Sequence, residues 1–227
     1  MKDHQIRTIL FDLDGTLLDT APDLAYALNT VLAEQARDTL PFETIRPCVS
    51  FGGIALVKLG FPEVPPGSDQ FEDLRQRLLA VYLENIARQT RPFPGMDTLL
   101  EHIEALDMNW GVVTNKPGWL TGPLMDTLQL SSRAACIISG DTTMQRKPHP
   151  EPMLHACRLA GSNADQCLYV GDARRDIEAG HNAGMLTMVA LFGYIPADEE
   201  PGQWGADAMV EHPNGIINWL EQHNATT

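Results

Sequence analysis

Basic residues are scarce in this sequence. Its 227 residues include 16 Lys or Arg against 30 Asp or Glu, which gives a formal net charge of -14 at pH 7. Nucleic acids and anionic lipid surfaces are bound through clustered Lys and Arg, so the charge argues against both as partners. A phosphate ligand would have to be held by local positive charge, from a metal ion, one or two cations or helix N-termini.

Long apolar runs and targeting signals are missing as well. The uncharged stretch 183–197 is short and contains Gly184, Gly193 and Pro196, so it is not expected to span a bilayer. The first residues show no sustained apolar run of the kind that forms a signal peptide. We expect a soluble, cytoplasmic protein without a membrane partner, as a monomer or a homodimer.

Cysteine is also sparse, and its spacing predicts no metal cluster. Cys48, Cys136, Cys157 and Cys167 form no CxxC pair and have no histidine at zinc-ligand spacing. Each lies in or beside an apolar stretch, which favours reduced, buried thiols. Hydrophobic residues at 44% and charged residues at 20% are typical of a globular protein of one large or two small domains, not of a disordered or fibrous chain.

Strands and helices alternate through most of the chain. A buried strand is expected at 9–11, and after a linker at 91–95 short apolar strands alternate with helices. The expected strands are 110–113, 136–138, 167–170, 187–191 and 208–210, and the expected helices are 96–106, 118–128, 151–160, 174–183 and 214–223. This order predicts an α/β protein with a parallel sheet and helices on both faces.

A mostly helical segment, residues 18–91, interrupts this alternation after the first strand. Apolar residues at helical spacing predict helices near 22–37 and 71–87, with Asp19 or Thr20 as the N-cap of the first. Open α/β sheets bind ligands at the carboxyl ends of their strands. This helical insertion would lie over that edge and is a candidate lid.

The first strand ends in two acids, Asp12 and Asp14, within the pentapeptide DLDGT. Acids are rarely placed together in a buried crevice unless a cation neutralises them. A solvated turn with two chance acids is the alternative. The apolar strand before the pair and the Gly-Thr after it favour a site at the strand end.

Two further positions carry groups that bind phosphate. Thr114 and Asn115 follow an expected strand, and a hydroxyl followed by free backbone N–H groups can hold phosphate oxygens. The alternative for Thr114 is an N-cap of the next helix. Lys147 precedes another helix, where a fixed ammonium would neutralise both acids and phosphate. A solvated loop lysine is the alternative, and spacing alone does not choose between Lys147 and Arg146.

A third strand-end acid is Asp172, after the apolar strand 167–170, and Asp176 lies one helical turn further on the same face. N-capping of the next helix is the alternative for Asp172 alone. Three carboxylates, a hydroxyl and an ammonium at successive strand ends are more specific than any one of them. Hard oxygen ligands with spare positions for water suit Mg²⁺.

The order of these motifs resembles that of the haloacid dehalogenase superfamily. All four are present, in order, over nearly the whole chain: DLDGT at 12–16, Thr114-Asn115, Lys147-Pro148, and Gly171-Asp172 with Asp176. The resemblance implies a Rossmann-like core of residues 1–17 and 92–227, an aspartyl-phosphate intermediate and Mg²⁺. Residues 17–24 (LLDTAPDL) look like the phosphoglycolate phosphatase-like branch, in which a cap, residues 18–91 in this chain, follows the first motif.

The resemblance also implies a role for each residue. Asp12 would attack phosphorus, and Asp14 would protonate the leaving alkoxide and then activate water. Mg²⁺ would be held by the Asp12 side chain, the Asp14 carbonyl and Asp172, with Asp176 orienting ligands or water. The transferring phosphoryl oxygens would be held by Thr114, the Asn115 N–H and Lys147.

A narrower resemblance concerns the substrate. Residues 110–117 (WGVVTNKP), 193–195 (GYI), 204–207 (WGAD) and 212–213 (HP) look like the N-acetylmuramic acid 6-phosphate phosphatases of bacterial cell-wall recycling. These stretches lie in the core. In the cap, which selects substrate, Gly52-Gly53 is suggestive and is expected to need close backbone approach. The expected reaction is hydrolysis of a small phosphomonoester, N-acetylmuramic acid 6-phosphate, with 2-phosphoglycolate as the alternative.

Other functions fit parts of the pattern. A receiver-type signalling domain also places acids, a threonine and a lysine at strand ends, but it is much shorter, lacks a helical insertion and has an adjacent acid pair. A sugar phosphomutase would share the active site and differ only in where the phosphoryl group goes. A dehalogenase is disfavoured because Asp14 supplies an acid–base group that carbon–halogen cleavage does not need.

Overall fold

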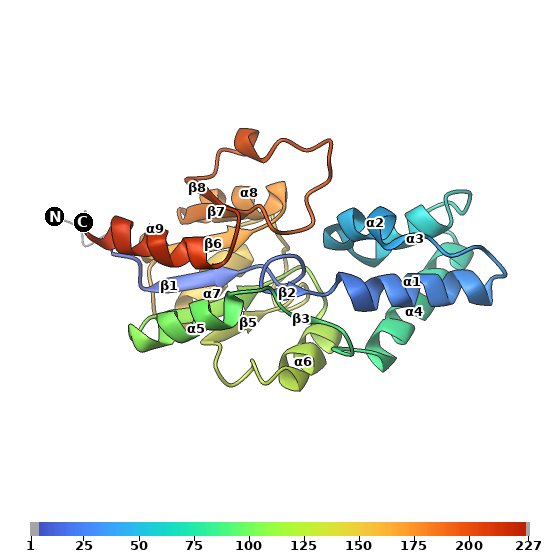
Figure 1. Ribbon diagram of the computed structural model, residues 1–227, viewed down its shortest axis with the longest axis horizontal. Coiled ribbons are helices and arrows are strands. Elements are labelled where there is room, and N and C mark those ends of the chain that lie inside the picture. Colours follow the sequence, from blue (N-terminus) through green and yellow to red (C-terminus); the bar gives the residue numbers. More distant parts are fainter. Residues whose placement is uncertain (1–4, 226–227) are drawn as a thin grey trace.

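A computed structural model describes residues 5–225 and shows a parallel sheet with helices on both faces (Figure 1). The strand order is β5-β4-β1-β6-β7-β8, and every neighbouring pair is parallel. The strands are β1 (Thr8–Phe11), β4 (Asn109–Val113), β5 (Cys136–Ile138), β6 (Cys167–Gly171), β7 (Leu186–Ala190) and β8 (Ala208–Val210). The predicted fold class is confirmed, and each strand end lies within one residue of its expected position.

The sheet is buried on both faces because its strands are largely apolar. All four residues of β1, the strand between β4 and β6, are buried. Ile9 and Phe11 pack on one face and Leu10 on the other. The first face is covered by α5 (Met96–Ala105), α6 (Gly118–Thr127) and α9 (Asn214–Ala225), and the second by α7 (Glu151–Ala160) and α8 (Arg174–Ala183).

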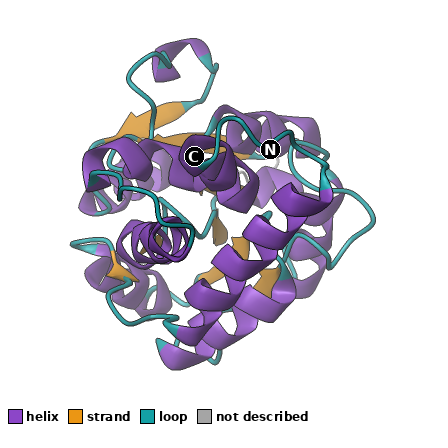
Figure 2. Ribbon diagram, turned by 90° about the vertical axis from the view of Figure 1, so that its right-hand side faces the viewer, coloured by secondary structure: helices purple, strands orange, loops and turns teal. Residues whose placement is uncertain are grey.

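The helical insertion has a hydrophobic core of its own. It comprises α1 (Ala21–Glu34), α2 (Phe42–Ile45), the 3-10 helix η1 (Arg46–Phe51), α3 (Gly52–Gly60) and α4 (Asp69–Glu84). Their apolar faces meet in one cluster, in which α1 and α4 pack against each other. The insertion lies beyond the carboxyl ends of the strands, at the right of Figure 1, and Figure 2 views the molecule from that end.

Two short antiparallel strands lie where the chain enters and leaves the insertion. β2 (Leu18–Asp19) pairs with β3 (Arg91–Pro92), so the stretch 91–95, predicted to be a linker, is in part a strand. Nearby, the buried Asp23 accepts hydrogen bonds from the backbone N–H groups of Gln89 and Thr90 and from the Thr90 hydroxyl. These bonds tie the entry to the exit, because a buried carboxylate is stable only when its oxygens have partners.

Two helix N-termini differ from the sequence-based expectation. Helix α4 begins at Asp69 rather than Phe71 because Ser68 caps it, accepting a hydrogen bond from Phe71 N at 3.2 Å. Thr20 precedes α1 as predicted, but its hydroxyl does not cap the helix. It donates to Asp14 at 2.6 Å instead, so a residue expected to serve local structure contacts a candidate catalytic acid.

The cysteines are free thiols. Cys136, Cys157 and Cys167 are buried as expected, whereas Cys48 is only half-buried. Burial raises the pKa of the Cys136 thiol to about 12, so it stays protonated at neutral pH. Within residues 5–225, no helix combines the length and the apolar character that crossing a membrane requires.

Candidate active site

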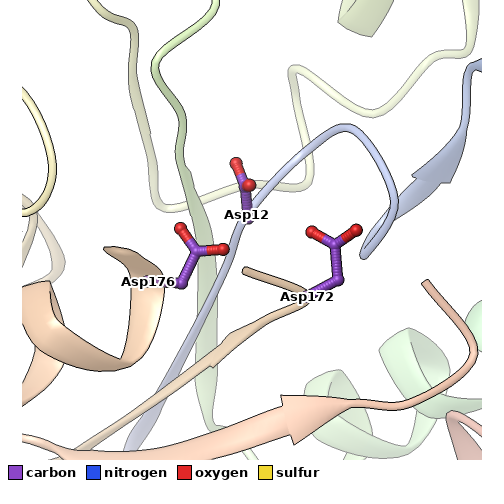
Figure 3. A group of neighbouring side chains, drawn as sticks. All are labelled: Asp12, Asp172 and Asp176. Atoms are coloured by element: carbon purple, nitrogen blue, oxygen red, sulfur yellow. The ribbon is translucent and has the colours of Figure 1, made fainter. Parts of the chain in front are cut away.

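Three buried carboxylates meet where the carboxyl ends of β1 and β6 lie side by side. Asp12 follows β1, Asp172 follows β6, and Asp176 lies in the first turn of α8. One oxygen from each lies within 4.8 Å of the other two, and the side chains face a common space (Figure 3). Neighbouring parallel strands end at the same edge of the sheet, which is why residues far apart in the sequence meet.

One buried lysine balances two of these acids. Lys147 Nζ lies 2.9 Å from Asp12 Oδ1 and 2.8 Å from Asp176 Oδ1, and its side chain is 1% exposed. Nζ also donates to the Tyr169 hydroxyl at 2.8 Å, and that hydroxyl donates to the carbonyl of Val113. Lys147 is therefore a fixed charge at the acids rather than a solvated loop lysine. Tyr169 was not predicted, because a tyrosine inside an apolar strand resembles an ordinary core residue.

Asn115 and Lys147 hold their two loops together. The Asn115 side chain accepts a hydrogen bond from Lys147 N and donates one to Lys147 O, both at 3.1 Å. Arg146, which spacing could not separate from Lys147, donates instead to the carbonyl of Gly140. The structure therefore brings Lys147, and not its neighbour, to the carboxylates.

Thr114 is buried at the end of β4. Its hydroxyl accepts a hydrogen bond from the Lys116 N–H at 3.2 Å, and its own proton stays available for another acceptor. The alternative role considered for Thr114, capping the next helix, belongs to another residue. Asp141 accepts the hydrogen bond from Gly118 N, at the start of α6, at 2.8 Å.

Asp172 has one satisfied carboxylate oxygen and one without a partner. Oδ2 accepts hydrogen bonds from Ser50 Oγ at 2.7 Å and from Tyr194 N at 2.8 Å. Oδ1 is buried and has no hydrogen-bond partner among the described residues. Burial, and then the carboxylates of Asp12 and Asp176, raise the pKa of Asp172 to about 7. A buried oxygen without a partner, set among like charges, fits a bound cation.

The donor set suits a hard cation such as Mg²⁺, because it consists of carboxylate oxygens. Asp176 differs from Asp172 in that both of its oxygens have partners. Oδ1 faces Lys147, and Oδ2 accepts from Ala173 N at 3.0 Å. Burial raises the pKa of Asp176, although the Lys147 ammonium acts in the opposite direction. This arrangement suits a residue that orients its neighbours.

The Asp14 side chain lies outside this group of three acids. Its Oδ1 accepts the hydrogen bond from Thr20 and lies 2.9 Å from Lys116 Nζ. Burial by itself would lower the pKa of Lys116, but the Asp14 carboxylate and the Tyr82 hydroxyl more than offset this and raise it. Lys116 was not predicted, because its position in TNKP reveals neither where its side chain points nor that it reaches the first motif.

The pair Gly52-Gly53 makes no close contact with other described residues, and its expected approach to a substrate stays a prediction. A Cβ at Gly52 would meet no atom within 4 Å, and one at Gly53 would lie 3.4 Å from Leu79, an ordinary contact. Gly52 is needed for its backbone, whose φ of 75° is unfavourable for other residues.

Comparison with known proteins identifies the family. The model of the haloacid dehalogenase-like hydrolases matches residues 9–190, which include every motif from DLDGT to Asp176. The chain belongs to this family. The membership excludes the receiver-type alternative. It agrees with the order of the strand-end motifs along the chain.

Several relatives have names that state a reaction. A phosphoglycolate phosphatase from Xylella fastidiosa is 41% identical over 92% of this chain and 90% of its own. An N-acetylmuramic acid 6-phosphate phosphatase from Pseudomonas putida is 41% identical over 92% of this chain and 93% of its own. The crystal structure of a phosphoglycolate phosphatase predicted in Haemophilus somnus has a TM-score of 0.84 at 27% identity and covers 95% of this chain and 98% of that one. This haloacid dehalogenase-like hydrolase is a phosphatase.

Close backbone approach is required at Gly15 of the phosphatase. Its φ is 87°, and a Cβ there would overlap the Asp172 carboxylate and the Tyr194 ring. We expect Gly15→Ala to displace Asp172 and to lower the rate of phosphate release by about 100-fold. Gly202→Ala is the matched control, because a Cβ there meets no atom within 4 Å, and it should keep the wild-type rate. Equal rates in the two variants would show that the loop tolerates the side chain.

Proposed function

We propose that this phosphatase depends on Mg²⁺ and hydrolyses a small phosphomonoester through an aspartyl-phosphate intermediate. The observation that carries the proposal is the buried Asp12. One of its oxygens is held 2.9 Å from Lys147 Nζ, and the neighbouring Asp172 offers an oxygen without a partner among the described residues. A carboxylate fixed in this way is positioned for attack, because the entropic cost of orienting it has already been met in the folded protein.

In the proposed reaction Asp12 is the nucleophile. Its carboxylate oxygen forms a bond to phosphorus as the bond from phosphorus to the ester oxygen breaks. Asp14 gives its proton to the leaving oxygen and then takes a proton from the water that attacks the aspartyl phosphate. The second step breaks the bond between phosphorus and Asp12 and releases inorganic phosphate, so both carboxyl groups return to their starting states.

The remaining residues hold the phosphoryl group and the cation. Lys147 loses one of its two ionic partners when Asp12 becomes an acyl phosphate, while Asp176 remains 2.8 Å away, and its ammonium then stabilises a phosphoryl oxygen. The other proposed phosphoryl contacts are the Thr114 hydroxyl and the Asn115 N–H. Mg²⁺ would be held by the Asp12 side chain, the Asp14 carbonyl and Asp172, oriented by Asp176. When bound, it would supply positive charge against the charge that develops on the phosphoryl oxygens.

We also propose that residues 18–91 act as a cap on a core of residues 1–17 and 92–227. Two hydrogen bonds support a functional contact between them. Ser50, in η1 of the insertion, donates to Asp172, and Arg175 Nη2 of the core donates to the Ser50 carbonyl at 2.6 Å. A segment that touches a candidate metal ligand can exclude water from the phosphoryl group and contact the leaving alcohol.

The proposed substrate is N-acetylmuramic acid 6-phosphate, with 2-phosphoglycolate as the second candidate. Relatives named for each reaction are equally similar to this chain, at 41% identity. The alcohol released from either ester carries a carboxylate, so the two candidates share a chemical class as well as a phosphate group.

A phosphate-release assay tests the proposal. The purified protein with Mg²⁺ should be compared on N-acetylmuramic acid 6-phosphate, 2-phosphoglycolate, common sugar phosphates and p-nitrophenyl phosphate. We expect the highest kcat/KM for one of the first two. Higher kcat/KM for an unrelated sugar phosphate would refute the substrate, and isomerisation of a sugar phosphate without phosphate release would indicate a phosphomutase.

A further inference from the structure

A second buried polar group of residues adjoins Asp14, where α4 of the insertion meets the loop between β4 and α6. Lys116 Nζ is 2.9 Å from Asp14 Oδ1 and 4.4 Å from the centre of the Tyr82 ring. The Lys116 side chain is only 6% exposed, and Tyr82 is fully buried. The Lys116 ammonium belongs to the core and the Tyr82 phenol to the insertion. The two groups therefore meet at the boundary between them, next to the proposed general acid.

Both groups have unused hydrogen-bonding capacity. The Tyr82 hydroxyl is buried and has no hydrogen-bond partner among the described residues. The ammonium of Lys116 carries three donors, and among residues 5–225 it donates one hydrogen bond, to Asp14. Leaving such donors buried without an acceptor costs free energy, and a ligand that brings acceptor oxygens removes this cost. The reaction steps proposed above use neither residue, so the pair is open to a role in binding.

The position of Asp14 indicates which part of a ligand would reach this pair. A general acid must come within hydrogen-bond distance, about 3 Å, of the ester oxygen that it protonates. Lys116 Nζ already lies 2.9 Å from an oxygen of Asp14, so it is within reach of substituents on the carbons next to the ester oxygen. Oxygens that carry negative charge are the preferred acceptors for a desolvated ammonium.

We propose that Lys116 and Tyr82 form a specificity subsite that binds a carboxylate on the leaving alcohol, so that the enzyme prefers phosphate esters of hydroxy acids. This inference rests on the proposed function and narrows its substrate class. The carboxylate could come from a short hydroxy acid or from an acidic sugar, but the reach argument favours the short hydroxy acid, because the carboxylate of N-acetylmuramic acid 6-phosphate is attached through the oxygen on C3, several bonds from the ester oxygen on C6. In 2-phosphoglycolate the carboxylate is attached to the ester carbon itself, so we expect the larger effect with this short ester.

Binding to an inactive variant tests the subsite without turnover. In the Asp12→Asn background, calorimetry should compare 2-phosphoglycolate with 2-hydroxyethyl phosphate, in which an uncharged CH₂OH replaces the carboxylate. N-acetylmuramic acid 6-phosphate and N-acetylglucosamine 6-phosphate form the second matched pair. We expect 2-phosphoglycolate to bind with an affinity at least about tenfold higher than that of its neutral partner, because a hydrogen bond to a charged group contributes a difference of this size.

Substitutions then assign the preference to these two residues. Lys116→Met should abolish the preference, Lys116→Arg should retain most of it, and Tyr82→Phe should reduce it. Lys58→Met is the matched control, since Lys58 is an exposed lysine on α3, and it should leave the preference unchanged. The same pattern is expected in the kcat/KM ratio of each matched pair for variants that retain Asp12.

Equal affinity of the protein for both members of each pair would overturn the subsite, and this comparison requires no substitution at Lys116. Equal weakening of both members by Lys116→Met would also overturn it, because Lys116 would then serve only to position Asp14. Failure of the proposed function looks different. In that case the wild-type protein would release no phosphate from any ester, whatever the ratio of affinities.

Discussion

Asp12→Asn should lower the rate of phosphate release by about 10⁴-fold or more, with the fold retained. The amide has the shape of the carboxylate but lacks the charge that attacks phosphorus and binds a cation. The substitution also removes one negative charge from a group in which Asp172 and Asp176 lie close by. We therefore expect the folded protein to tolerate the change, although Lys147 loses an ionic partner.

The measurement is phosphate release alongside a thermal melt of each variant. Asp73→Asn is the matched control, because Asp73 is an exposed residue of α4 and the same substitution there should be neutral. A folded Asp12→Asn variant that keeps more than about a tenth of the wild-type rate would exclude Asp12 as the nucleophile.

Removal of Mg²⁺ should abolish activity. Three carboxylates within 4.8 Å of one another, one of them with an oxygen that lacks a partner among the described residues, motivate the requirement. EDTA should stop phosphate release and added Mg²⁺ should restore it. Ca²⁺ should inhibit, because it prefers more ligands at longer distances and would displace the attacking Asp12. Asp172→Asn should prevent recovery by Mg²⁺. Full activity in a metal-free preparation would contradict the prediction.

The pKa of Asp172 predicts how the effect of Mg²⁺ changes with pH. In the metal-free folded protein this pKa is about 7, above the ordinary value of 3.8. Ionised Asp172 therefore costs stability in the folded state, and this cost develops as the pH rises from about 4 through 7. Because Mg²⁺ binds the ionised form, the melting temperature should rise more on adding Mg²⁺ at pH 8 than at pH 6. An equal rise at both pH values would argue against Asp172 as a ligand.

The secondary structure of the core could be predicted from local pattern. Short apolar strands such as 136–138 and helices such as 151–160 were expected with the observed bounds. A parallel sheet covered on both faces needs near-continuous apolar strands, and that requirement is visible in a single sequence. The start of α4 was missed because the cap Ser68 lies three residues before Phe71, the first apolar residue of the pattern.

The proposed nucleophile, acids, threonine and lysine were all identified from the sequence, because each follows a strand or precedes a helix within a recognisable motif. Their roles remain predictions, as do the domain boundaries, the cytoplasmic location and the oligomeric state. Spacing along the chain could not choose between Lys147 and Arg146, since both lie in the same loop. The structure distinguishes the two by the direction of their side chains. Lys147 reaches the acids and donates to the Tyr169 hydroxyl, whereas Arg146 donates to the carbonyl of Gly140.

Sequence alone established the fold class, the order of the motifs and the residue types that phosphoryl chemistry needs, because these depend on local periodicity and on groups at strand ends. Only the tertiary structure brought Ser50 to Asp172, Lys116 to Asp14 and Tyr82 to Lys116. These contacts join the insertion to the core across long stretches of chain. They depend on how two hydrophobic clusters meet, one of which includes Leu120 and Tyr194 of the core beside the helices of the insertion, and no local pattern records the relative position of two such units.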